Sequence, residues 1–122
     1  MSKPNVFPLF LPEIKEMISL KNFRSLRHFL EDIDPIDLAD NWHALSPEEQ
    51  MIIFRLLPRK LESQLFEELE LQEQQKLLEQ LTDSNVQSLL AGLDPSETSE
   101  LVRELPPKFV HRFTQLLKKA ER

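Results

Sequence analysis

A twelve-residue rhythm constrains this chain more than any other feature. Between Asp34 and Leu117 the sequence divides into seven consecutive units of equal length, each closing on a leucine. The eighth place is apolar in every unit but the first, which has Asn41, and the ninth in every unit but the last, which has Thr114. The units read DPIDLADNWHAL, SPEEQMIIFRLL, PRKLESQLFEEL, ELQEQQKLLEQL, TDSNVQSLLAGL, DPSETSELVREL and PPKFVHRFTQLL.

This period predicts many short helices rather than one long helix. An α-helix turns about 100° per residue, so a step of twelve advances it roughly 120° beyond whole turns. The closing leucines of one continuous helix would therefore scatter over three faces. Within a unit, by contrast, places five, eight, nine and twelve form the i, i+3, i+4, i+7 stripe of an amphipathic helix. Each unit is predicted to be one short helix followed by a tight turn.

Residues that begin helices stand at the unit starts. Asp34, Ser46 and Asp94 each precede a proline, which pairs a capping side chain with a residue suited to the first helical position. Ser46 and Glu49 have the spacing of a capping box, and Asp94 with Glu97 imitates one.

Other capping residues extend this interpretation. Thr82 or Asp83 is expected to cap the fifth unit, and Gly92 to take the left-handed conformation after its end. Before the repeat, a helix is predicted over residues 13–21, and Asn22 is predicted to cap a second one.

Residues 1–12 are predicted to form a proline-rich N-terminal arm. Prolines at 4, 8 and 12 favour an extended segment and oppose helix. Because the arm is also apolar, two interpretations are open. It covers the exposed end of the helical stack, as the ends of repeat arrays must be covered, or it docks another chain.

The fold class predicted from these patterns is all-α. Helices of about nine residues are marginal alone in water, so consecutive units should pair as hairpins and the pairs should stack. The expected result is a solenoid of about nine short helices with a 24-residue hairpin repeat, occupying residues 13–120.

Composition narrows the classes of function. The 122 residues suffice for one domain, and no cysteine is present for a disulfide or a thiolate metal site. The net charge of −6 argues against nucleic acid as a partner. No apolar run suits direct insertion into a membrane, and no secretory leader is recognisable, so a cytoplasmic location is expected. Catalysis is not expected, because no cysteine nucleophile or glycine-framed serine occurs.

The first two units carry a family resemblance. IDPIDLADNWHAL, followed by SPEEQMIIFRLLP, resembles the cytosolic N-terminal domain of MgtE-type magnesium transporters. The likeness covers about residues 13–118, and LDPSETSELVRELPPKFVHRFTQLL looks like the family's second acidic repeat, with Glu97 and Glu100 where aspartates are usual. The matching positions of the first motif are Asp34, Pro35, Asp37, Leu38, Ala39, Asp40, Leu45, Leu56, Leu57 and Pro58.

The resemblance implies a fold and a function. It implies a right-handed superhelix of short helices, similar to armadillo repeats, on the cytosolic side of a transporter. Acidic residues of the domain would bind Mg²⁺ together with CBS domains, in cis or in trans, and the bound metal would favour the closed pore. The isolated domain is expected to be a monomer that binds Mg²⁺ weakly. Both a domain cut from a longer protein and a stand-alone module are compatible with the sequence.

Five carboxylates are the candidate metal ligands, although the first three can also be explained without a metal. Mg²⁺ prefers oxygen ligands and keeps several waters, so one or two carboxylates from this domain would suffice. From the residues alone, however, the first of them is the expected cap of its helix, the second complements the helix dipole, and the third is a surface group. The candidates are Asp34, Asp37, Asp40, Glu97 and Glu100.

The alternative hypothesis is a metal-independent interaction scaffold, either similar to the short-helix domains of the flagellar protein FliG or a stand-alone module. Such a scaffold would hold a partner through its groove and its N-terminal arm. Other acidic residues, at positions 67, 68, 70 and 73, are interpreted as a solvated face and assigned no site.

Overall fold

The chain is entirely helical over the part that the structure describes. A computed structural model describes residues 7–120, and this range contains nine α-helices, one short 3-10 helix and no strand. The predicted all-α fold class is confirmed. The elements are α1 (Phe7–Ser19), α2 (Phe23–Leu30), α3 (Pro35–Asp40), η1 (Trp42–Ala44), α4 (Pro47–Leu56), α5 (Arg59–Glu68), α6 (Leu71–Gln80), α7 (Asp83–Ala91), α8 (Pro95–Glu104) and α9 (Pro107–Ala120).

The twelve-residue rhythm reappears in the helix starts. α3 begins at residue 35, and α4 to α9 begin at 47, 59, 71, 83, 95 and 107, so each start lies twelve residues after the last. Four of these helices, α4, α5, α6 and α8, end at a C-cap leucine whose backbone is extended: Leu57, Leu69, Leu81 and Leu105. Each unit is therefore one helix and one tight connection, as the spacing predicts.

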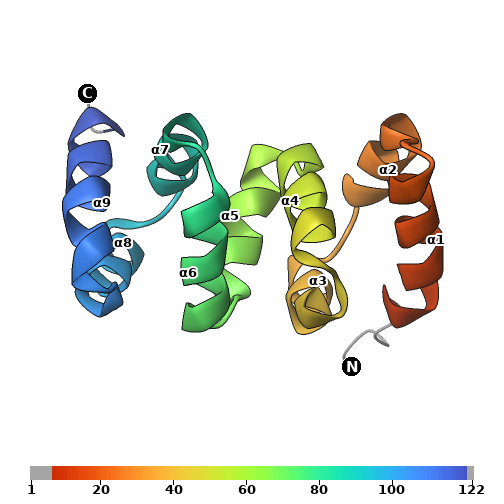
Figure 1. Ribbon diagram of the computed structural model, residues 1–122, viewed down its shortest axis with the longest axis horizontal. Coiled ribbons are helices and arrows are strands. Elements are labelled where there is room, and N and C mark those ends of the chain that lie inside the picture. The colour runs from red at the N-terminus through yellow and green to blue at the C-terminus, as the bar shows by residue number, and fades with distance from the viewer. Residues whose placement is uncertain (1–6, 121–122) are drawn as a thin grey trace.

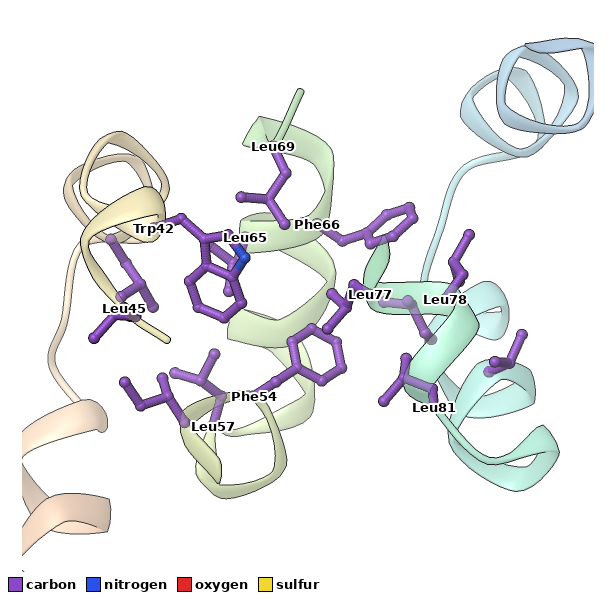
Figure 2. Packing of buried hydrophobic residues seen from close by; sticks show 14 of the residues in the cluster. Trp42, Leu45, Phe54, Leu57, Leu65, Phe66, Leu69, Leu77, Leu78 and Leu81 are labelled. Carbon is purple, nitrogen blue, oxygen red and sulfur yellow. The ribbon is translucent and has the colours of Figure 1, made fainter. Parts of the chain in front are cut away.

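The apolar columns of the repeat form the core. The eighth-place residues are buried in every unit after the first, and the large rings of Trp42, Phe54 and Phe66 are buried beside them. Figure 2 shows these side chains pointing into the space between successive helices. Among the side chains described, residues 7–118, none that is polar or charged is buried. The buried closing leucines are Leu45, Leu57, Leu69, Leu81 and Leu105, whereas Leu93 and Leu117 are only half-buried.

Alternate helices contact one another along the chain. α3 packs on α5, α5 on α7 and α7 on α9, while α2 packs on α4. Figure 1 shows the helices spread along the long axis in chain order, from α1 at one end to α8 and α9 at the other. The right-handed superhelical course implied by the family resemblance stays a prediction.

A side-chain hydrogen bond recurs after 24 residues, whereas the pairing of consecutive helices as hairpins stays a prediction. The Gln50 side-chain amide donates to the backbone carbonyl of Trp42 at 2.9 Å, and the Gln74 amide donates to the carbonyl of Phe66 at 2.7 Å. Both the donors and the acceptors of these two bonds lie 24 residues apart. Each glutamine, in the early turns of α4 or α6, adds a second donor to a carbonyl that already accepts a backbone N–H, that of Leu45 at Trp42 and that of Leu69 at Phe66. Thr98 occupies the third such position and donates to the carbonyl of Asp94 instead.

The predicted helix caps are confirmed at four positions. Asn22 accepts from the backbone N–H of Ser25, Asp34 from that of Ile36 and Thr82 from that of Asn85. Ser46 and Glu49 form the complete capping box. Asn41, the break in the eighth-place column, donates to the backbone carbonyl of Asp37 at 2.8 Å and so forms a hydrogen-bonded turn.

The extended arm predicted for residues 1–12 is wrong for residues 7–12, which belong to α1. Pro8 lies in the first turn, where no helical N–H is needed, and Pro12 removes only one hydrogen bond of the helix. Burial of Phe7 and packing of Phe10 on Phe29, with ring centroids 5.6 Å apart, offset that loss. The helix covers α2 and α4, as the capping interpretation expects. Residues 1–6 of the predicted arm lie outside the described residues.

Two predicted backbone features are also wrong. Gly92 has a φ of −89° and is not left-handed. A Cβ at Gly92 would instead meet Oγ of Ser63 on α5, so a larger residue there requires that hydroxyl to rotate away. The Asp94 side chain makes no capping hydrogen bond. The capping box that Asp94 and Glu97 imitate in the sequence therefore does not form.

Candidate carboxylate site

The carboxylates predicted as magnesium ligands on α3 occupy one short helix. Asp34 is exposed and accepts a hydrogen bond from the backbone N–H of Ile36 at 2.9 Å. Asp37 is half-buried in the first turn, and Asp40 is exposed at the last position. The capping and dipole roles open to Asp34 and Asp37 are thus filled by the fold itself.

The other two predicted ligands lie on α8, far along the molecule from α3 (Figure 1). Glu97 is half-buried in the first turn of that helix, and Glu100 is exposed one turn later. The structure therefore keeps the two predicted acidic groups apart, and any metal that they bind would occupy separate places.

A pocket of about 200 Å³ opens between α5, α6 and α8, and carboxylates dominate its polar lining. Glu67 comes from α5, whereas Glu97, Glu100 and Glu104 are spaced along α8. These positions on α8 follow i, i+3 and i+7, so the three side chains share one helical face. The remaining walls are Phe66, Leu71, Gln74, Leu93 and Leu101.

Glu67 and Glu97 form a carboxyl pair at this pocket. The hydrogen bond to Glu97 raises the pKa of Glu67 to about 7, and burial and the charges of Glu97, Asp94 and Glu68 act in the same direction. Two carboxylates at this range repel each other when both are ionised, which favours the neutral form of Glu67. Oε2 of Glu97 is buried and has no hydrogen-bond partner in the described residues. A cation bound between the two carboxylates would relieve this repulsion.

The described residues do not contain a complete metal centre. Over residues 7–120, no group of three or more His, Cys, Asp or Glu side chains has the arrangement needed to hold an ion. A carboxyl pair with an orphaned buried oxygen nevertheless fits part of a magnesium site, because Mg²⁺ takes one or two carboxylates and retains waters. The residues present fit a shared site rather than a closed one.

Sequence reasoning missed Glu67 and Glu104. Glu67 was grouped with a solvated acidic run, and the twelve-residue period does show that it lies off the apolar stripe. The period does not show which outer edges of stacked helices meet. The cross-stack bonds join residues about 30 apart, as from Gln75 to Glu104 and from Arg112 to Asp83. Glu67 and Glu97, which interact across the stack, are separated by a similar distance in sequence, and this spacing would have indicated the pair.

The fold and the site together define a class: an all-helical repeat module whose chemically distinctive groups are surface carboxylates. Over residues 33–122 the sequence matches the model of the MgtE intracellular N domain, so the chain belongs to that family. The family is the N-terminal domain of a magnesium transporter, as the resemblance in the first two units implies. No curated protein matches the chain. No helix among the residues described is both long and apolar enough to span a bilayer.

Proposed function

We propose that this chain is the magnesium-sensing regulatory domain of an MgtE-type transporter. The observation that carries the proposal is the family match over residues 33–122, which includes α3 to α9. In this role the domain lies on the cytosolic face of the membrane, binds Mg²⁺ jointly with a CBS domain, and thereby favours the closed channel. A purely regulatory, non-enzymatic role belongs to the same proposal.

The distribution of carboxylates supports a shared metal site. The α8 pocket offers Glu97 and Glu100 with Glu67 beside them, and α3 offers Asp37 and Asp40. Since neither group is complete, the missing ligands must come from water or from the partner domain. Weak binding by the isolated chain and tighter binding in the presence of the partner follow directly.

A thermal-melting titration with millimolar Mg²⁺ tests the proposal, with and without a CBS-domain pair from an MgtE transporter. A ligand that binds only the folded state raises the melting temperature by mass action. The rise should be small for the chain alone and larger with the CBS pair. Glu97→Gln/Glu100→Gln should reduce it if the α8 pocket is used, and Asp37→Asn/Asp40→Asn if α3 is used. Exposed Glu79 on α6 supplies the matched control, Glu79→Gln.

Absence of any Mg²⁺ response with the CBS pair present would exclude magnesium sensing. A loss of response in Glu79→Gln as large as in the site variants would show general charge screening instead of site binding.

A metal-independent interaction scaffold is the second candidate. It is favoured by the absence of a preformed metal cluster in residues 7–120. A CBS pair that binds the chain equally well in the presence of a chelator would support this alternative.

A further inference from the structure

A groove at the N-terminal end of the stack is lined by two arginines. It lies between α2 and α4 and has a volume of about 500 Å³. We call it the α2–α4 groove. Its lining residues are Phe23, Arg24, Arg27, His28, Glu31 and Leu56.

Helical spacing places the two arginines of this groove on one face of α2. Positions 24, 27, 28 and 31 follow i, i+3, i+4 and i+7, so they lie on one face of α2 and its last turn. Arg24 and Arg27 therefore point the same way, one turn apart. Phe23, which is 38% exposed, and half-buried Leu56 of α4 add an apolar wall.

The two arginines have no carboxylate partner within the described part of the chain. The ion pairs found there join Lys15 to Glu49, His28 to Glu31 and Arg112 to Asp83. α2 itself contains no acidic residue. Against the two arginines the groove lining has a single carboxylate, Glu31, so its exposed side chains keep an excess of positive charge in a chain whose net charge is −6.

The α2 side of the groove lies outside the region shared with the MgtE family, whereas Leu56 of α4 lies inside it. The family match begins at residue 33, and α2 ends at Leu30. The groove shares no residue with the proposed magnesium sites on α3 and α8.

We propose that the α2–α4 groove docks an acidic segment of a partner protein. Arginine presents a planar fork of donors that matches a carboxylate, so Arg24 and Arg27 would each take an aspartate or glutamate of the segment. An apolar side chain between those acids would lie against Phe23 and Leu56. Arginine and aromatic residues are the types enriched where proteins bind proteins, which favours a peptide over a lone anion.

Fluorescence anisotropy of a labelled peptide tests this docking, with aspartates alternating with leucines in the peptide and the whole 122-residue chain as receptor. Arg24→Glu/Arg27→Glu should weaken binding by about 10-fold or more, because attraction becomes repulsion at both positions. Arg103→Glu/Lys118→Glu makes the same change in net charge at exposed positions near the other end of the stack and should leave the affinity within about 2-fold. Phe23→Ser should weaken binding of this peptide but not of one with serines in place of the leucines.

Thermal melting checks that the variants fold, and Arg24→Gln/Arg27→Gln gives a milder pair if the reversals do not. Failure of the wild-type chain to bind the peptide would overturn the proposal, as would equal losses in the groove and control variants. Arginine-dependent binding to phosphatidylserine vesicles without peptide binding would also overturn it, and would identify a membrane surface as the ligand. None of these outcomes depends on Mg²⁺, so they are separable from the failure of the proposed function.

Discussion

At the scale of single residues, the polar side chains act mainly at the ends of helices. Ser46 and Glu49 satisfy each other's backbone N–H groups, and Lys15 reaches Glu49 at 3.0 Å to tie α1 to α4. Burial tends to raise the pKa of Glu49, but the hydrogen bonds from Ser46 and Lys15 outweigh it and lower that pKa. One carboxylate thus joins a helix start to a contact between helices.

Lys21 offers a direct test of backbone strain at such an end. Its φ of 56° is the left-handed conformation, and the N–H groups of Lys21 and Asn22 close α1 by bonding the carbonyls of Ile18 and Met17. A side chain in this conformation costs roughly 1 kcal/mol that glycine avoids. We expect Lys21→Gly to raise the free energy of unfolding by about 0.5–1 kcal/mol in urea denaturation. The exposed control Lys76→Gly, in the middle of α6, should lower it by about 1 kcal/mol. Destabilisation by Lys21→Gly would contradict the strained ending.

Glu62 should make stability depend on pH. Burial raises its pKa from the ordinary 4.5 to about 7, although Arg59 opposes the shift. Because the folded pKa lies above the unfolded one, the stability given by the neutral carboxyl is complete below pH 4.5 and is lost as the pH rises through 7. Glu62→Gln should therefore be more stable than wild type by about 1 kcal/mol at pH 8, a value reduced for partial exposure, and equal to it near pH 4. Urea denaturation at both pH values measures the difference, and a pH-independent gap would contradict the assignment.

At the scale of elements, the side-chain amide of Gln74 joins α6 to the end of α5 and allows a test of that contact. The Gln74 side chain donates to the Phe66 carbonyl near the end of α5, which also accepts a longer bond of 3.3 Å from the backbone N–H of Leu69. Gln74→Ala should cost about 1 kcal/mol because this partly buried carbonyl loses a donor. Gln72→Ala, exposed on the same helix, should be nearly neutral. Equal stabilities of the two variants in denaturant would show that water replaces the glutamine without cost.

The elements also show how far the sequence predicts the structure. Helix starts from α3 to α9, the buried columns and four caps follow from local rules, because each depends on residues within one unit. The α1 start was not predicted, because burial of Phe7 and Ile14 outweighs two prolines only once α2 and α4 are present. The left-handed conformation predicted for Gly92 is wrong, and the contact that its position does make is with Ser63, which is distant in sequence.

The candidate site was only partly predictable for the same reason. Glu97 and Glu100 were singled out by their motif, and they do lie together on one face of α8. Their partner Glu67 comes from α5, and only the packing of the stack brings it there. Local spacing identifies a face of a helix, whereas a site requires knowledge of which faces meet.

At the scale of the whole molecule, the stack should lose its structure by segments. Its contacts join mainly helices that are one or two places apart in the chain. In repeat arrays with such short-range contacts, stability is close to the sum of the units and their interfaces. Phe66 is buried in the middle of the row and Phe113 is buried in α9 at its end. Removing either ring creates a cavity that costs about 3–5 kcal/mol at its own interface.

The two positions should nevertheless differ in how far the damage spreads. In native-state hydrogen exchange, Phe113→Ala should speed exchange in α8 and α9 while amides of α4 and α5 remain protected, because the remaining helices keep their own contacts. Phe66→Ala should speed exchange on both sides of α5, since that helix contacts both α3 and α7. Uniform loss of protection throughout the chain in both variants would show that the domain unfolds as a single cooperative unit, and the additive description of the stack would be wrong.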